Sequence, residues 1–322
     1  MNKMYVLLFL ILANLFWAGN YVLGKYVVEE LSPLQMTFSR WFIALFLLFP
    51  IAHWVERPHW KSVWKEWKVL SLAGLLGIIA FNFLLYEALQ YTTSMNAALI
   101  SSINPVIIVL FSSLLLKERI PLRNGIGLLI SLLGVLLVLT QGKLLQVFHM
   151  NFNQGDLFVL LAILVWTFYS ILGKNMKGIP PISATAVSAV FGLLMMLPFV
   201  MVSGIPYPLS NQSMIGLLYF GIFPSVASFI FWNVALRHTD ASRAGIYLNL
   251  IPVFTAVINL TLGKTINFIQ VVGGIFVFIG VYLTSKKRRK NNEGSLAARS
   301  LREAEEQSEI EVAEEKHAIT HQ

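Results

Sequence analysis

Apolar residues run through the chain in ten long stretches, and short polar segments separate them. Most stretches approach the roughly 20 residues that an α-helix needs to cross the hydrocarbon core of a bilayer. Helices are the expected spanning elements, because backbone groups in lipid must be satisfied within their own segment. The predicted spans cover residues 5–24, 34–52, 69–90, 96–116, 122–140, 156–174, 183–203, 213–236, 242–262 and 267–285. The pattern therefore predicts an all-α integral membrane protein with ten transmembrane helices.

The second half of the chain repeats the first at a separation of about 148 residues, as internal structural repeats do. The matched positions, first copy before second, include Trp17 and Trp166, Pro33 and Pro181, Pro105 and Pro252, Gly127 and Gly273, and Gly134 and Gly280. Because each copy holds five spans, an odd number, the copies must cross the membrane in opposite directions. We predict a first five-helix repeat over residues 1–142, a second over 150–286 and a charged, disordered tail over 287–322.

Composition supports a polytopic membrane protein, since 57% of the residues are hydrophobic and only 12% are charged. Soluble domains carry about 25% charged residues. Basic residues set the orientation, because cytoplasmic loops are enriched in Lys and Arg. With the N-terminus inside, the outer loops hold only Lys25, Lys143 and Lys264. Both termini are therefore expected in the cytoplasm, and the net charge of +8 faces anionic lipid headgroups rather than nucleic acid.

The sequence contains no pattern typical of catalysis or metal binding. Cysteine is absent, and the histidines lie in loops and at span ends without ligand spacing. Gly263-Lys264-Thr265 is similar to the end of a phosphate-binding loop, but Ile258 stands where the leading glycine is required. We therefore expect no enzyme activity, no cofactor and no metal.

The segment between the second and third spans, residues 53–68, predicts a short helix in the membrane interface. Trp60, Val63, Trp64 and Trp67 share one face of that helix, and lysines lie off it. Tryptophan prefers headgroup depth, so the expected role is an aromatic anchor, and a functional lid is the alternative.

Two ionisable residues lie well inside the spans, Arg40 and Glu87. Such residues are costly in hydrocarbon and are candidates for function. Both lie near the outer ends of their spans, at depths where they could pair. One interpretation is an ion pair that locks the outer half of the bundle. The other is that Arg40 receives a substrate carboxylate and Glu87 an amine or a coupling proton.

Polar and aromatic side chains recur at mid-depth in both copies. Span 1 presents Asn14, Trp17 and Asn20, and span 6 presents Trp166, Tyr169 and Ser170. Matched stripes of this kind predict a substrate cavity between the halves, with ordinary helix packing as the alternative. The other cavity candidates are Asn82, Tyr86, Ser102, Trp232, Asn233, Tyr247 and Asn249, and the predicted helix bends are Pro105 and Pro252.

These features together resemble the drug/metabolite transporter superfamily of the EamA type. The residues that carry the resemblance are Leu116-Lys117-Glu118-Arg119-Ile120 ahead of Gly127 and Gly134-Val135, Trp17, Arg40 after Pro33, and Ala88-Leu89 leading to Ala97 and Pro105. The resemblance covers residues 5–285 and implies a bacterial plasma-membrane carrier, most often an exporter, with a central cavity between its halves. The second copy has lost charge, because Lys264 or Thr265 answers Glu118 and Ser188 answers Arg40.

The expected function is secondary transport of small metabolites such as amino acids or their derivatives, by alternating access. An aromatic, Asn-rich lining with one Arg suits a small zwitterionic or amphipathic compound. A broad drug or sugar carrier is the alternative within this class, and a membrane structural or assembly protein without transport is the alternative outside it. The expected partners are a small-molecule substrate and the lipid bilayer, and a homodimer stays open as an alternative to the monomer.

Overall fold

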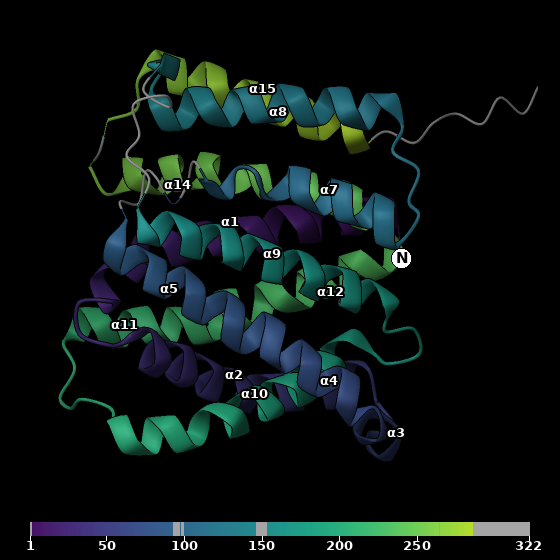
Figure 1. Cartoon of the computed structure of the whole chain (residues 1–322), viewed down its shortest axis with the longest axis vertical. Coiled ribbons are helices and arrows are strands. Elements are labelled where there is room, and N and C mark those ends of the chain that lie inside the picture. Colours follow the sequence, from purple (N-terminus) through teal and green to yellow (C-terminus); the bar gives the residue numbers. More distant parts are fainter. Residues whose placement is uncertain (1, 93–96, 98–99, 146–152, 264, 286–322) are drawn as a thin grey trace, which may run out of the picture. The chain divides into compact units, whose positions relative to one another are not determined.

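A computed structural model describes residues 2–92, 97, 100–145, 153–263 and 265–285 of the chain. Every regular element in these residues is a helix (Figure 1). Met1–Ser285 forms one compact unit. The predicted tail, residues 287–322, lies outside the described residues.

The helices follow the predicted apolar runs closely. In chain order the elements are α1 (Lys3–Val27), α2 (Pro33–Val55), α3 (Trp60–Lys65), α4 (Trp67–Ala73), η1 (Gly74–Ala80), α5 (Phe81–Tyr91), α7 (Asn104–Leu115), α8 (Leu122–Thr140), α9 (Gln154–Asn175), α10 (Pro181–Ser203), α11 (Asn211–Phe220), η3 (Gly221–Ala227), α12 (Ser228–His238), α13 (Ala241–Ile246), η4 (Tyr247–Asn249), α14 (Leu250–Thr261) and α15 (Phe268–Ser285). Within the described residues, eight helical stretches are long and apolar enough to cross a membrane. Two shorter apolar helices, Asn104–Leu115 and Phe268–Thr284, lie in the fourth and tenth predicted spans.

Local sequence explains where several helices begin. Pro33 and Pro181 occupy the first turn of α2 and α10, where the missing N–H costs no helical bond. Ser32 and Gln35 form a reciprocal capping box at the start of α2. The predicted interfacial helix is shorter than residues 53–68, because α2 continues to Val55 and α3 covers six residues.

The sequence repeat recurs in the structure as a repeat of unusual helix geometry. The third helical stretch of each copy contains a π-helical segment, η1 in the first and η3 in the second, at corresponding positions. A π-helical turn displaces the regular hydrogen-bond ladder and is frequent at functional sites. Asn82 Nδ2 donates to the carbonyls of Gly77 and Ile78 in η1, each at 3.0 Å. Trp17 Nε1 donates to the carbonyl of Pro224 in η3 at 3.2 Å.

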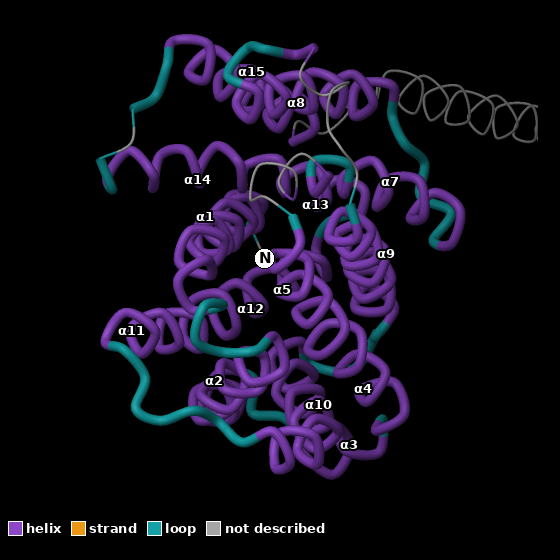
Figure 2. The backbone as a smooth tube through the Cα atoms, turned by 60° about the vertical axis from the view of Figure 1, so that its left-hand side comes forward, coloured by secondary structure: helices purple, strands orange, loops and turns teal. Residues whose placement is uncertain are grey.

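Helices from the two copies interleave in pairs that the repeat relates. α2 packs against its own counterpart α10, and α8 packs against its counterpart α15. α1 packs against α12 of the second copy, as α9 packs against α5 of the first. Figures 1 and 2 both show α8 beside α15 and α2 beside α10. The two copies therefore fold as one unit, and each supplies helices that cover the other.

The bundle has two ends, which we name after an acidic residue at each. The Glu118 end carries the connections that follow α2, α7, α9 and α12, on the right in Figure 1. The Asp156 end carries the connections that follow α1, α10 and α14, together with the start of α9.

Four glycines allow α8 and α15 to approach until their backbones touch. A Cβ atom on Gly134 would lie 2.5 Å from the carbonyl oxygen of Gly273, and one on Gly127 would lie 2.7 Å from that of Gly280. These pairs run in opposite directions along the two helices, so α8 and α15 are antiparallel. Small residues that permit such close contact are typical of helix pairs in membranes.

We predict that Gly134→Ala lowers the stability of the protein, because the new methyl group meets backbone atoms that cannot rotate away. The expected loss is about 1–3 kcal/mol, measured as the shift in thermal unfolding of the purified protein in detergent. Gly125→Ala is the matched control on the same helix, because nothing lies within 4 Å of its Cβ position. That control should stabilise α8 by about 0.5–1 kcal/mol through helix propensity. Equal effects of the two variants would contradict the close contact.

Candidate functional site

Arg40 on α2 is 1% exposed and is held by uncharged oxygens from both copies. Its Nε donates to Ser225 Oγ of η3 at 2.7 Å. Its Nη1 donates to Asn20 Oδ1 of α1 at 3.2 Å, to Asn82 Oδ1 of α5 at 3.0 Å and to the hydroxyl of Tyr86. The Tyr86 hydroxyl in turn donates to Asn20 Oδ1 at 2.9 Å. We call these five residues the Arg40 cluster.

Arg40 and Glu87 do not form the ion pair that the sequence suggested. In the described part of the chain, the one salt bridge within 4.0 Å joins Arg243 to Asp240. Glu87 follows Tyr86 directly, and consecutive helical residues point about 100° apart. Because Tyr86 faces Arg40, the carboxylate of Glu87 is directed elsewhere. Arg40 is thus a buried cation whose described partners are all neutral.

The second copy contains a related group of polar side chains. Asn233 Nδ2 donates to the Tyr169 hydroxyl at 2.7 Å and to Thr185 Oγ1 at 3.0 Å. Tyr169 is the repeat counterpart of Asn20, and Asn233 is the counterpart of Tyr86. Both copies therefore contain a Tyr–Asn hydrogen bond between corresponding helices, α1 and α5 in the first copy and α9 and α12 in the second. The tyrosine and the asparagine have exchanged places.

An aromatic cluster lies between the two polar groups. The rings of Trp17 and Trp166 meet edge to face with centroids 5.0 Å apart, and Trp232 lies 5.6 Å from each of them. Phe229 packs edge on against Trp166 at 5.6 Å. Edge-to-face contacts of this kind add to the burial of the rings. The cluster joins α1, α9 and α12 at mid-depth.

Two small cavities flank the aromatic cluster. The first, of about 40 Å³, is lined by the predicted residues Trp17, Asn20 and Trp166 and also by Tyr21, Ser101 and Asn104. The second, of about 10 Å³, is lined by the predicted residues Tyr169 and Asn233 and also by Thr185, Ser188 and Arg237. Metabolite pockets generally need about 300 Å³ or more. Both cavities are therefore closed to a metabolite in this conformation.

The remaining predicted site residues lie outside these cavities. Asn14 donates from Nδ2 to the carbonyl of Leu10 on its own helix at 2.6 Å. Asn249 donates to Ser131 of α8 at 2.8 Å, so it ties η4 to a peripheral helix. Ser102, Ser170 and Tyr247 are buried. Pro105 and Pro252 lie in the first turns of α7 and α14, and the 3₁₀ turn η4 precedes α14.

Two carboxylates tie the copies together at the Glu118 end. Glu118 accepts from the backbone N–H groups of Ala241 and Ser242, at 2.9 and 3.0 Å, and from the Ser242 hydroxyl at 2.6 Å. Glu56 does the same at the start of α10, where the N–H groups of Ile182 and Ser183 lie at 2.8 and 2.7 Å. Free N–H groups at a helix N-terminus favour an anionic partner.

Two further carboxylates tie the copies together at the Asp156 end. Asp156 at the start of α9 accepts from the Thr92 hydroxyl at 2.5 Å. Glu30 accepts from the backbone N–H of Ser210 at 2.9 Å and from the Ser210 hydroxyl. The bond from the Ser210 hydroxyl, and to a lesser extent the bond from its backbone N–H, hold the pKa of Glu30 below its ordinary value. We call these four contacts the carboxylate latches.

Sequence reasoning missed the latches and part of the cavity lining. Glu118 appeared only within the family-like motif, and Glu56 lay within the predicted interfacial segment. A carboxylate beside a span end, with serine one or two residues into a helix of the other copy, is the signal that could have found both. The described residues hold no group of three His, Cys, Asp or Glu side chains suited to a metal ion.

Comparison with known proteins agrees with this architecture. The chain matches the EamA-like transporter family over residues 4–140 and again over 153–286. It is 31% identical over 290 residues to an "Uncharacterized transporter" of Archaeoglobus fulgidus, covering 88% of this chain and 98% of that one. It is 28% identical over 290 residues to the "Uncharacterized transporter YyaM" of Bacillus subtilis, covering 88% of this chain and 95% of that one.

A solved crystal structure shares the fold, with a TM-score of 0.70 at 20% sequence identity, covering 88% of this chain and 98% of the other. The family match falls on both halves of the chain and the helices are long and apolar. The chain therefore belongs to the EamA-like transporter family and is a multi-pass membrane transporter.

Proposed function

We propose that this protein is a ten-span secondary carrier that exports small carboxylate-bearing metabolites, amino acids or their derivatives first among them. Transport proceeds by alternating access across the bacterial plasma membrane. The Glu118 end faces the cytoplasm, because the basic residues outside the spans gather there.

The observation that carries this proposal is the buried guanidinium of Arg40. A charge inside a span is expensive and is usually balanced by an opposite charge or used in function. Arg40 has no carboxylate within 4.0 Å among the described residues. Neutral oxygens fix the position of the Arg40 guanidinium without cancelling its charge. A substrate carboxylate offers the planar, bidentate partner that a guanidinium prefers.

The carboxylate latches support alternating access. Each latch joins one copy to the other, and the bundle has latches at both ends. Release of one end while the other stays closed would open the interior cavities to one side at a time. The small volumes of both cavities fit an occluded state of such a cycle.

We predict that Arg40→Gln removes the preference for a free carboxylate. Purified protein in liposomes is screened by counterflow with labelled amino acids, and each acid is compared with its uncharged amide. The wild-type preference for the acid should fall at least about 30-fold in the variant, since a buried charge pair is worth about 2–5 kcal/mol. Lys61→Gln on the exposed face of α3 is the control and should change nothing. Exchange of sugars alone, unchanged by Arg40→Gln, would contradict the carboxylate chemistry.

We predict that Glu56→Gln opens the Glu118 end. The amide replaces a carboxylate that accepts three hydrogen bonds, and bonds to a charged group contribute about 1.5–3 kcal/mol each. Because the chain has no cysteine, a single Thr185→Cys reports opening through its rate of labelling by a water-soluble reagent. The rate should rise about tenfold or more. Asp156→Asn loosens the opposite end and should lower the labelling rate of Thr185→Cys. A rise in both variants would indicate general loosening instead of alternation.

The orientation is tested with reporter fusions that are active only outside the cytoplasm. A fusion after Leu145 should be active, and a fusion after Asn175 should be silent, because α9 returns the chain to the cytoplasmic side. The reverse pattern would overturn the assignment of the Glu118 end to the cytoplasm.

A further inference from the structure

The polar group around Asn233 has the features of a second binding site. We propose that Tyr169, Thr185, Ser188, Asn233 and Arg237, here called the Asn233 cluster, form a second substrate site on the Glu118 side of the aromatic cluster. It takes the same carboxylate-bearing substrate as the Arg40 cluster. This inference rests on the proposed transport function.

Two residues of the Asn233 cluster have unpartnered polar atoms and line the same small cavity. Ser188 is 2% exposed and Asn233 is 8% exposed, and both line the small cavity on this side. Neither Ser188 Oγ nor Asn233 Oδ1 has a hydrogen-bond partner among the described residues. Buried polar groups are normally satisfied, and a group that is not calls for an explanation. A bound ligand that supplies the missing hydrogen-bond partners would explain both atoms.

The repeat gives these residues a counterpart with a clearer role. Ser188 occupies the position of Arg40, and Asn233 the position of Tyr86. Arg40 lies about 10 Å along the axis from the start of α2, at the Asp156 end. Ser188 lies equally far from the start of α10, at the Glu118 end. The two clusters are thus placed at opposite depths, with the tryptophans between them.

Charge at the second site comes from a different helix. Arg237, in the last turn of α12, lines the cavity and donates from Nη2 to the carbonyl of Ile179 at 3.0 Å. A substrate carboxylate would bind this guanidinium, and an ammonium or hydroxyl donor would bind Asn233 Oδ1. The cluster therefore suits the small zwitterion that the Arg40 cluster also suits.

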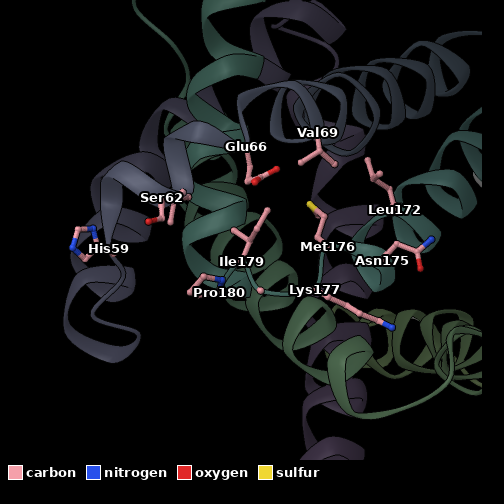
Figure 3. A pocket seen from close by; sticks show the side chains of 12 residues that line it. His59, Ser62, Glu66, Val69, Leu172, Asn175, Met176, Lys177, Ile179 and Pro180 are labelled. Atoms are coloured by element: carbon pink, nitrogen blue, oxygen red, sulfur yellow. The ribbon is translucent and has the colours of Figure 1, made fainter.

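A larger cavity provides the route to this site. A vestibule of about 530 Å³ opens at the Glu118 end between α3, the start of α4 and the connection from α9 to α10. Its lining includes His59, Glu66 and Asn175. Figure 3 shows Met176 and Ile179 projecting across it toward Glu66 and Val69, with Lys177 directed away. The volume is in the range of metabolite pockets.

Met176 separates the vestibule from the second site, because it lines both cavities. Methionine is unbranched and flexible, so its side chain can move aside without a change of backbone. The Glu56 latch binds Ile182 and Ser183 in the first turn of α10, less than one turn before Thr185 and less than two turns before Ser188. Release of that latch would loosen the same wall and let the cavity expand to hold a substrate.

The test uses proteoliposomes in which the full-length carrier has one orientation, so that KM is measured separately at each face. Arg237→Gln should raise KM about tenfold at the Glu118 face and leave it unchanged at the other face. Ser188→Ala should also raise KM at the Glu118 face, by a smaller factor. Because the Ser188 hydroxyl has no partner, its removal should not disturb packing, and a change in KM would report substrate binding. Arg40→Gln should raise KM mainly at the Asp156 face. Arg237→Lys should recover part of the loss.

A second measurement is independent of transport rates. A single Met176→Cys in this cysteine-free chain should react with a water-soluble thiol reagent, and substrate added at the Glu118 face should slow the reaction severalfold. Lys65→Cys is the control, because Lys65 is exposed on α3 outside the vestibule lining. Substrate should not change its rate.

Equal changes of KM at both faces in an active carrier would overturn the second site and leave the proposed function intact. Absence of substrate protection at Met176→Cys would also overturn it. Absence of exchange by the wild-type protein with any amino acid would overturn both the proposed function and this inference.

Discussion

Hydrogen-bonding groups within the spans must find partners inside the protein, and much of this structure depends on that requirement. The two π-helical segments displace backbone carbonyls from the regular ladder. Asn82 binds two of those carbonyls through its amide nitrogen and turns its oxygen to Arg40. Ser225 in the other π-helical segment binds the same guanidinium. The irregular turns thus help to position a cation whose hydrogen bonds come from both copies.

The apolar runs predicted the helices well, because length and hydrophobicity alone decide whether a segment can cross a bilayer. The repeat predicted which residues correspond, and the structure shows that the matched glycines of α8 and α15 also lie in contact. The π-helical segments were not predictable from periodicity, since Gly74–Ala80 reads as an ordinary apolar helix. The pairing of Arg40 with Glu87 was wrong because depth along a span does not fix the direction in which a side chain points.

The two copies share the same helix arrangement, but the side chains at several matched polar positions differ. The Tyr–Asn hydrogen bond survives in both copies with its residues exchanged, so the geometry of the contact is retained when the side chains are not. The buried charge is not retained, because Ser188 stands where the first copy has Arg40. The cation of the second cluster, Arg237, comes instead from the last turn of α12, where it is only partly buried and its desolvation costs less.

In the proposed cycle the guanidinium of Arg40 stays in the protein while a substrate comes and goes, so Arg40 itself adds nothing to the charge that crosses the membrane. A zwitterion carries no net charge, and the voltage across the membrane neither helps nor hinders it. A monoanion carries one negative charge outward, and an inside-negative potential of roughly 100 mV contributes about 2.3 kcal/mol to that step. The same guanidinium would serve an electrically silent cycle for one metabolite and a voltage-driven one for another.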